Sequence, residues 1–248
     1  MTDYRRITLN QKRLIKSLQI KKYRKQEQCF LVEGAKSIQE LITSDFEIQM
    51  IAGTAAYLSG QTFKGIEVVE VSEKELEGLG EFQSNNTALA VARIKPNTPI
   101  EVESDEFALV LDDIRDPGNL GTIIRTADWY GIRKIIASNE TADFYSSKVI
   151  TSTMGSFTRI GIFYTDLDTF LGQSKQKIFG TFLDGQSIHT TDFGAGGLIV
   201  IGNESHGISS RFDNFITDRI TIPRYGEAES LNAAIATAII CDNLRRSA

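Results

Sequence analysis

Cysteine and histidine are scarce in this 248-residue chain, which contains two of each. Cys29 and Cys241 have no motif spacing, so neither a disulfide framework nor a metal site is indicated, and reduced thiols in or near the core are expected. The first residues lack the apolar run of a secretory signal. No stretch approaches the roughly 20 apolar residues that cross a bilayer. We therefore expect a cytoplasmic protein without a membrane segment.

Phosphate-binding glycine motifs are also missing. Neither G-x-x-x-x-G-K-[ST] nor G-x-G-x-x-G follows the first strand of either half, which disfavours P-loop and dinucleotide binding. Residues 194–197 are glycine-rich but precede a strand, so they fit a flexible turn. His206 has only His189 as a second histidine, and no nucleophile elbow is present, so histidine acid–base catalysis has little support.

The composition, 41% hydrophobic and 24% charged, is sufficient for a globular core. Residues 96–106 hold two of the four prolines and four acidic residues with little apolar content. This composition is typical of a linker. It predicts one domain over residues 1–95 and another over residues 107–248.

Predicted strands and helices alternate in both parts, which indicates an α/β fold, and in the second part they indicate a parallel sheet with helices on both faces. In the first part, strands are expected at 29–32, 48–52, 66–71 and 88–94, with helices at 10–20, 35–43 and from 72, where the spacing fits a capping box. In the second part, strands are expected at 107–111, 134–137, 159–163, 177–182, 198–201 and 219–222, with helices at 120–130, 146–153, 167–171 and at the carboxyl end.

Positive charge is concentrated near the amino end, although the whole chain has a net charge of −5. Residues 1–28 contain nine Lys or Arg against Asp3 and Glu27. A basic patch on an acidic protein is typical of phosphate binding. A solvated basic helix without a partner is the alternative that the composition leaves open.

Residues 111–131 form the first stretch that could carry chemistry. A strand ends at two aspartates, and the following turn leads into a helix that Asn119 is expected to cap. Arg125 falls outside the buried stripe of this helix, near the sheet edge where open α/β folds bind ligands. The alternative is a surface arginine paired with Asp128.

Two further stretches place polar residues after buried strands. In residues 197–209 the strand leads into Gly202 and then Glu204, a carboxylate that could be functional or could cap a neighbouring turn. In residues 220–238 a short strand, a polar loop and a helix rich in small residues follow one another. Ser230 is expected to cap that helix, with Leu231 and Asn232 in its first turn. Such a helix start can present backbone amides to a ligand.

Together these stretches resemble the three motifs of the SpoU/TrmH RNA 2′-O-ribose methyltransferases of the SPOUT superfamily. The resemblance rests on residues 119–125 (NLGTIIR), 198–207 (LIVIGNESHG) and 222–236 (IPRYGEAESLNAAIA) in the same order and spacing. Residues 148–155 resemble the helix between the first two motifs. One position departs, since the family often has a second serine two residues after the asparagine, where this chain has Ala234.

The resemblance implies a parallel sheet with a deep C-terminal trefoil knot, one of the rare exceptions to unknotted topology. Residues 1–95 resemble the family's smaller RNA-binding domain, which is similar in fold to a ribosomal large-subunit protein. The implied cofactor is S-adenosyl-L-methionine bound in the knot. A homodimer with active sites at its interface is also implied.

Residue roles are carried over by motif. Gly202, Ile222 and Leu231 are expected to contact the cofactor, largely through backbone atoms, and Thr181 is a further candidate. The expected substrate-handling residues are Asn119, Arg125, Glu204, Ser230 and Asn232. Arg125 would hold the phosphate beside the target ribose, because a guanidinium can bind a phosphate through two parallel hydrogen bonds.

The expected reaction is methyl transfer to a ribose 2′-hydroxyl, the group that distinguishes RNA from DNA. Ribosomal RNA is favoured over transfer RNA because of the type of N-terminal domain. One alternative is a related enzyme that methylates a base, although such enzymes lack the Asn–Arg helix motif. Another is a catalytically silent RNA-binding protein of ribosome assembly with the same fold. A two-domain nucleotide-binding enzyme is the third, disfavoured by the missing phosphate loops.

Overall fold

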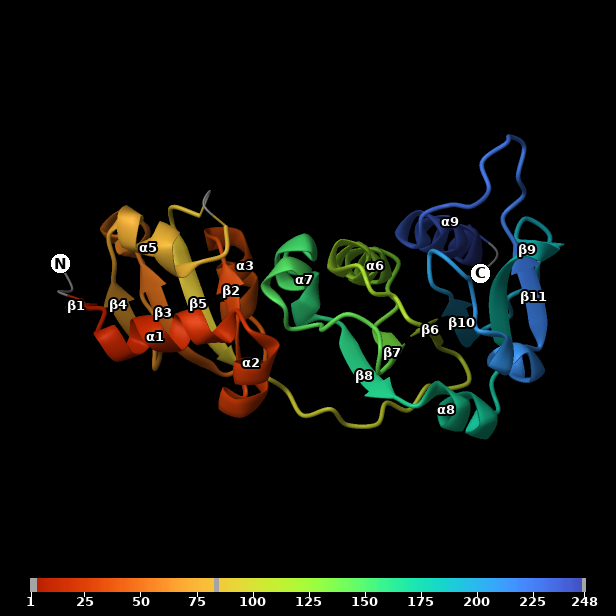
Figure 1. Ribbon diagram of the computed structural model, residues 1–248, viewed down its shortest axis with the longest axis horizontal. Helices are drawn as coiled ribbons and strands as arrows, with labels where there is room; N and C mark the ends of the chain where they lie inside the picture. The colour runs from red at the N-terminus through yellow and green to blue at the C-terminus, as the bar shows by residue number, and fades with distance from the viewer. Residues whose placement is uncertain (1–3, 83–84, 247–248) are drawn as a thin grey trace. The chain divides into compact units, whose positions relative to one another are not determined.

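The computed structural model describes residues 4–82 and 85–246, and the chain divides into two compact units (Figure 1). The first unit consists of Met1–Pro96 and Tyr145–Thr158. The second consists of Asn97–Phe144 and Arg159–Ala248. The segment Tyr145–Thr158 therefore belongs to the first unit, although its sequence lies between two strands of the second.

The first unit contains a mixed five-stranded sheet in the order β1-β4-β3-β5-β2. Strand β5 runs antiparallel to β2 and β3, and the other pairs are parallel. Its elements are β1 (Arg5–Arg6), α1 (Leu9–Leu18), α2 (Lys21–Glu27), β2 (Cys29–Glu33), α3 (Ala35–Ile42), β3 (Ile48–Gly53), α4 (Ala55–Leu58), β4 (Glu67–Glu70), α5 (Glu73–Leu79), β5 (Ala88–Arg93), α7 (Ser147–Ser152) and the 3₁₀ turn η1 (Ser156–Thr158).

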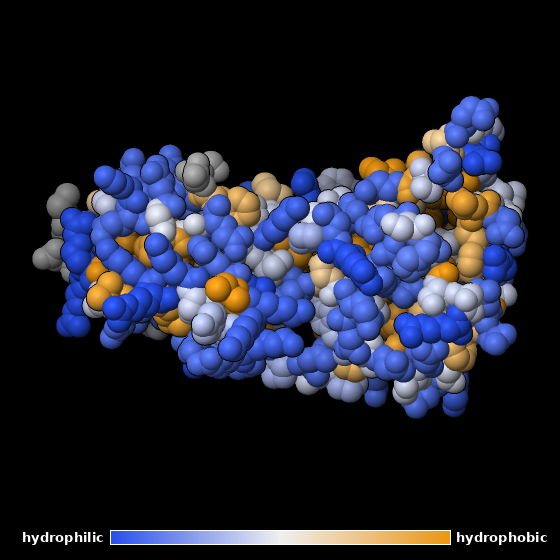
Figure 2. Space-filling view, in the orientation of Figure 1, coloured by the Kyte–Doolittle hydropathy of each residue, from blue (hydrophilic) through white to orange (hydrophobic). Residues whose placement is uncertain are grey.

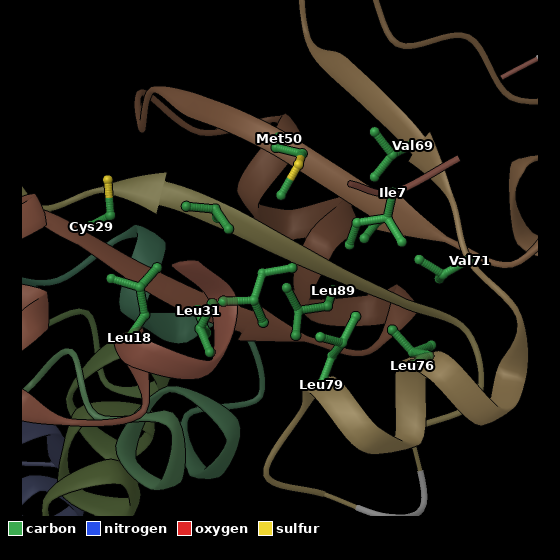
Figure 3. Packing of buried hydrophobic residues seen from close by; sticks show 13 residues of the cluster. Ile7, Leu18, Cys29, Leu31, Met50, Val69, Val71, Leu76, Leu79 and Leu89 are labelled. Atoms are coloured by element: carbon green, nitrogen blue, oxygen red, sulfur yellow. The ribbon is translucent and has the colours of Figure 1, made fainter. Parts of the chain in front are cut away.

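One face of this sheet packs against α1 and α5. Figure 3 shows the cluster, in which Leu31 and Leu89 from the sheet meet Leu18 of α1 and Leu76 of α5. The capping box expected at the start of α5 is confirmed by reciprocal hydrogen bonds between Ser72 and Glu75. Successive side chains of a strand point to opposite faces of the sheet, so every second residue of these strands contributes to this core cluster.

Segment Tyr145–Thr158 joins the first unit through aromatic rings. The Phe30 ring on β2 lies 4.7 Å from the Tyr145 ring and 6.1 Å from the Phe157 ring, measured between centroids. Phe46 also contacts Phe157 at 5.8 Å. Aromatic pairs at these separations stabilise a fold by about 0.5–1.5 kcal/mol each beyond area burial. These contacts explain why helix α7 packs against β2 of the first unit, although its neighbours in sequence are strands of the second unit.

The second unit contains a six-stranded sheet in the order β11-β9-β10-β6-β7-β8, and every neighbouring pair is parallel. The predicted parallel sheet is thus confirmed. Its elements are β6 (Phe107–Leu111), α6 (Pro117–Trp129), β7 (Lys134–Ser138), β8 (Gly161–Thr165), α8 (Leu167–Gln173), β9 (Ile178–Ser187), β10 (Gly197–Ile201), η2 (Ser210–Phe215), β11 (Asp218–Thr221) and α9 (Ala233–Arg246).

Both faces of this sheet are covered by helical segments. Ala108, Val110 and Val200 point to one face, where they pack against α8 and η2. Alternate residues of the same strands point to the other face, where α6 and α9 contact each other (Figure 1). Cys241 of α9 is buried there, Cys29 is buried in the first unit, and both are free thiols as expected. Within the described residues, every helix is too short or too polar to span a lipid bilayer.

Candidate functional site

A cavity of about 710 Å³ lies at the carboxyl ends of β9, β10 and β11. Its volume falls in the range of small-molecule sites, roughly 300–1,000 Å³. All four residues predicted to bind the cofactor line it, namely Thr181, Gly202, Ile222 and Leu231. Figure 2 shows hydrophobic residues grouped beside the loop that joins β11 to α9. The cavity thus combines apolar lining residues with the polar loops that follow β10 and β11.

Gly202 permits the tight turn that forms one wall of this cavity. Directly after it, Asn203 and Gly207 exchange two backbone hydrogen bonds of 3.0 and 2.9 Å. A Cβ atom on Gly202 would lie 2.2 Å from the carbonyl carbon of Gly207 and 2.2 Å from the nitrogen of Ile208. Because both neighbours are backbone atoms, any side chain here would displace the loop. Only glycine fits this position.

Three polar side chains from distant parts of the sequence meet next to the cavity. The Asn119 Nδ2 group donates a hydrogen bond of 2.6 Å to Glu204 Oε1, and Asn232 Nδ2 donates one of 2.9 Å to Asn119 Oδ1. Asn119 therefore joins α6 to the loop after β10 and to the start of α9. Glu204 itself lines the cavity, so this polar cluster borders the space that would hold a ligand.

The start of α9 differs from the prediction. The helix begins at Ala233, and Asn232 Oδ1 accepts hydrogen bonds from the backbone N–H groups of Ala234 (2.9 Å) and Ile235 (3.3 Å). Asn232, not Ser230, is thus the capping residue, and this role directs its Nδ2 group toward Asn119. Ser230 lines the cavity, and its hydroxyl has no hydrogen-bond partner within the described ranges.

The start of α6 also differs from the prediction. Asp116 is the capping residue, since its carboxylate accepts a hydrogen bond of 2.7 Å from the backbone N–H of Asn119, and Pro117 occupies the first helical position. Proline is favoured there because that N–H would have no partner within the helix. The side chain of Asn119 is therefore not needed as a cap and is available for Glu204 and Asn232.

Arg125 is exposed on α6 and does not line the cavity. The alternative pairing with Asp128 is wrong, because Asp128 binds Arg159 through hydrogen bonds of 2.8–3.1 Å. Across residues 4–82 and 85–246, Arg125 forms neither a hydrogen bond nor an ion pair. The structure thus brings Asn119, Glu204 and Asn232 together and leaves the Arg125 guanidinium available to solvent.

Asp113 is a residue whose role sequence reasoning missed. It has a left-handed backbone with φ of 60°, and its carbonyl accepts a hydrogen bond of 2.7 Å from Asn203 Nδ2. Its carboxylate lies 2.7 Å from Arg115 Nε and 3.5 Å from His206 Nε2. Asp113 thereby anchors the loop that carries Glu204. The two aspartates after a buried strand were the available sequence signal.

The neighbouring Asp112 should make stability depend on pH. Burial raises the pKa of this carboxyl above its ordinary value, although the Ser209 backbone N–H, 2.7 Å from Oδ2, acts in the opposite direction. Folding therefore favours the protonated form, and the stability contributed by this group decreases as pH rises from the ordinary carboxyl range through the raised pKa. Asp112→Asn keeps an acceptor for Ser209 and cannot ionise.

As pH rises from 4 to 7, we expect the free energy of unfolding of Asp112→Asn to increase progressively relative to that of the unsubstituted protein. Urea unfolding at several pH values measures this difference. Asp112→Ala is the control, since it leaves the Ser209 N–H unpartnered and should be about 1–3 kcal/mol less stable than Asp112→Asn at every pH. A constant difference between Asp112→Asn and the unsubstituted protein would contradict the role of burial.

The sequence profile of the SpoU rRNA methylase family matches residues 106–242, and that of the MRM3-like substrate binding domain matches residues 10–90. The chain is 28% identical over 235 residues to the 23S rRNA (guanosine(2553)-2′-O)-methyltransferase RlmP of Bacillus subtilis. This match covers 93% of this chain and 94% of RlmP.

Solved structures agree over nearly the whole chain. A protein from Porphyromonas gingivalis assigned to the TrmH family of RNA methyltransferases is 37% identical, with a TM-score of 0.88 over 98% of this chain and 99% of that one. An AdoMet-bound rRNA methyltransferase from Sinorhizobium meliloti is 29% identical, with a TM-score of 0.85 over 96% of each chain.

Fold, cavity and comparisons together define an RNA methyltransferase. The chain belongs to the SpoU rRNA methylase family. The resemblance drawn from the three motifs is thereby confirmed.

Proposed function

We propose that this protein transfers a methyl group from S-adenosyl-L-methionine to a ribose 2′-hydroxyl of ribosomal RNA. The observation that supports this proposal most directly is that Glu204 both lines the cavity and belongs to the polar cluster. A cofactor in the cavity would therefore lie next to the residues that would hold the substrate. The similar proteins named as rRNA 2′-O-methyltransferases, including RlmP over most of its length, support RNA ribose as the substrate. A substrate of ribosomal RNA would place the protein in the cytoplasm.

The cavity fits the cofactor on its own chemistry. Half-buried Gly202 and Ile222 line the cavity beside buried apolar side chains such as Ile201 and Ile220, a combination suited to an adenosine group. Thr181 Oγ1 already donates a hydrogen bond of 3.0 Å to the Val200 carbonyl. Thr181 would therefore contact the cofactor without donating a hydrogen bond to it. When bound, the cofactor supplies an activated methyl group.

The chain's own residues would chiefly position the RNA, since aligning the reacting groups accounts for much of the rate of such a transfer. Asn119 occupies one oxygen of Glu204, and the other oxygen would accept a hydrogen bond from the ribose. Asn232 fixes the Asn119 amide, and the unpaired Ser230 hydroxyl would contact the substrate. Arg125 would bind the adjacent phosphate and stabilise negative charge that develops on the ribose oxygen, because a guanidinium stays charged near neutral pH.

We further propose that the second unit contains the trefoil knot and forms a homodimer. The placement of β10 between β9 and β6, with β11 outside β9, is compatible with a threaded carboxyl end. Trp129 on α6 is 82% exposed, and Ile235 on the neighbouring α9 is 51% exposed. A second copy covering these apolar side chains would remove them from water. Analytical ultracentrifugation should give a dimer, and Trp129→Glu should weaken it.

The domain boundaries at 1–95, 96–106 and 107–248 belong to the same proposal, with the first part as an RNA-binding domain similar to a ribosomal large-subunit protein. The match of residues 10–90 to a substrate binding domain supports it. In the structure, Tyr145–Thr158 packs with this first part, so a version lacking residues 1–95 would expose Phe157 and the Tyr145 ring. We therefore expect experiments to require the full chain.

RNA affinity should decrease steeply with salt. The basic amino end would neutralise phosphates and release their counterions, and each contact to a single strand lowers log K by about 0.7 per unit of log salt. Fluorescence anisotropy with a labelled oligoribonucleotide between 50 and 300 mM KCl measures the slope. An affinity that does not change with salt would remove the electrostatic role of this segment.

A combination of cofactor titration and methyl transfer tests the function. Isothermal titration calorimetry should show S-adenosylmethionine binding, and tritiated methyl groups should be incorporated into bulk ribosomal RNA at ribose 2′ positions. Mapping 2′-O-methyl groups in ribosomal and transfer RNA from cells lacking the gene should then identify the target. RNA binding without any methyl incorporation would favour the catalytically silent alternative.

A further inference from the structure

Helix α2 presents a compact surface that the methyl-transfer site does not use. We define the α2 patch as Ile20, Lys21, Lys22, Tyr23 and Lys25, all of which are exposed. Ile20, the residue that precedes α2, is 55% exposed, and Tyr23 in its first turn is 37% exposed, so an aliphatic and an aromatic side chain lie among exposed lysines.

The lysines of this patch lack acidic partners. Lys12 and Arg6 elsewhere at the amino end are paired with Glu75 and Glu70, respectively. Lys21, Lys22 and Lys25 form no ion pair within the part of the chain that the structure describes. Lys21 and Lys25 are four residues apart, where like charges repel and destabilise a helix. Folding therefore does not account for this concentration of charge.

Arg24 holds the patch in place. Its side chain is only 4% exposed, and Nη1 donates hydrogen bonds of 2.9 and 2.8 Å to the carbonyl oxygens of Leu18 and Gln19 at the end of α1. Gln28 ends α2 with a left-handed backbone, φ of 52°. The only arginine in α2 thus has a structural role, and the exposed positions around it face solvent on a fixed support. A preformed surface loses little conformational freedom on binding.

We propose that the α2 patch binds single-stranded RNA, with an unpaired base stacked on Tyr23 against Ile20 and flanking phosphates held by Lys21, Lys22 and Lys25. An aromatic ring among unpaired lysines is the combination that recognises single strands, whereas RNA duplexes are recognised through backbone shape and 2′-hydroxyl groups. The Lys22 Nζ atom already lies 6.0 Å from the centroid of the Tyr23 ring, so charge and ring are within reach of one nucleotide.

This inference rests on the proposed function, because it adds a second RNA contact to the enzyme that methylates RNA. The inferred contact is made by an unpaired stretch of the RNA substrate that does not include the methylated nucleotide. An anionic membrane is the other polyanion that a basic patch can attract, but one isoleucine and one tyrosine provide little apolar surface to insert. Single-stranded RNA is therefore the partner that we assign.

Binding of a labelled 12-nucleotide single strand and of the corresponding duplex to the full-length protein tests the proposal. Tyr23→Ala should weaken single-strand binding about 5-fold or more, as expected for loss of one base stack, and should change duplex binding little. Tyr23→Phe keeps the ring and should bind like the unsubstituted protein. Lys21→Ala with Lys25→Ala should lower the salt slope by about 1.4, which corresponds to two phosphate contacts.

Lys64→Ala with Lys74→Ala is the matched control, because both lysines are exposed in the same unit and unpaired in the described residues. This variant should keep the salt slope. The proposal is overturned if Tyr23→Ala binds the single strand as well as the unsubstituted protein does, or if the control variant loses as much of the slope. Equal loss of single-strand and duplex binding in Tyr23→Ala would also overturn it, as would tighter binding of vesicles rich in anionic lipid than of RNA.

Two readouts separate this proposal from the proposed function. In Tyr23→Ala, S-adenosylmethionine affinity should be unchanged, because no patch residue lines the cofactor cavity, and the KM for RNA in methyl transfer should rise. If the unsubstituted protein transfers methyl groups and Tyr23→Ala keeps full RNA affinity, the patch alone is rejected. If the unsubstituted protein neither binds cofactor nor transfers methyl groups, the proposed function fails, whatever the behaviour of Tyr23.

Discussion

Arg125→Ala should abolish methyl transfer while leaving S-adenosylmethionine affinity nearly intact. The guanidinium is exposed, has no intramolecular partner in the described residues and does not line the cofactor cavity. Its removal should therefore change neither the cavity nor the packing of α6. By comparison with lost electrostatic contacts in other active sites, we expect kcat/KM to decrease by roughly 10²–10³-fold or more. Single-turnover methyl transfer and calorimetric titration of the cofactor measure the two effects.

Two variants sharpen this experiment. Arg133→Ala removes another exposed arginine of the second unit that forms no ion pair in the part of the chain described, so it controls for the loss of one positive charge. Arg125→Lys keeps the charge but not the planar pair of donors, so it should recover only part of the activity if the phosphate is bound through two parallel hydrogen bonds. Turnover at the unsubstituted rate in Arg125→Ala would reject the role.

The sheet of the second unit and the wall residues of the cavity could be predicted from the sequence. Apolar runs such as residues 107–111 and 198–201 are too short for helices and too continuous for a half-exposed strand, so they indicate buried parallel strands. The carboxyl ends of parallel strands lie at the same edge of a sheet, and only β9 separates β10 from β11, so Gly202 and Ile222 line the same space.

The helix starts could not be predicted from local preferences alone. Several residues before α6 and α9 are good caps, and the choice among them is made by contacts between elements. Asn232 caps α9 while its amide reaches Asn119, which lies 113 positions earlier in the chain. Asp116 caps α6 and thereby leaves Asn119 available for Glu204. In both cases the polar cluster, absent from any local pattern, decides where the helix begins.

The placement of Tyr145–Thr158 in the first unit could not be predicted from the sequence either, because it too depends on contacts between distant segments. The periodicity predicts a helix at 146–153, and α7 is present at Ser147–Ser152. Nothing in that segment shows that its aromatic partners are Phe30 and Phe46, more than 90 positions away. Side-chain packing between distant segments, rather than helix propensity, assigns α7 to the first unit.

Gly202→Ala should lower cofactor affinity strongly and reduce methyl transfer with it. The added methyl group would lie 2.2 Å from two backbone atoms, and the loop cannot easily move away. Ile208 is 7% exposed, and the next residue, Ser209, is held by the Asp112 carboxylate. Overpacking of this kind typically costs 1–3 kcal/mol. Relief by displacement of the loop would also move Glu204 away from Asn119.

Gly226→Ala is the matched control for this experiment. Gly226 lines the same cavity, yet a Cβ atom there would have no neighbour within 4 Å. Both substitutions restrict the unfolded chain to a similar extent, so the difference between them isolates the close contact at Gly202. We expect Gly226→Ala to bind S-adenosylmethionine within about 2-fold of the unsubstituted protein, and Gly202→Ala to bind at least 10-fold more weakly, a loss of about 1.4 kcal/mol. Equal affinities in the two variants would show that the turn after β10 does not shape the cofactor site.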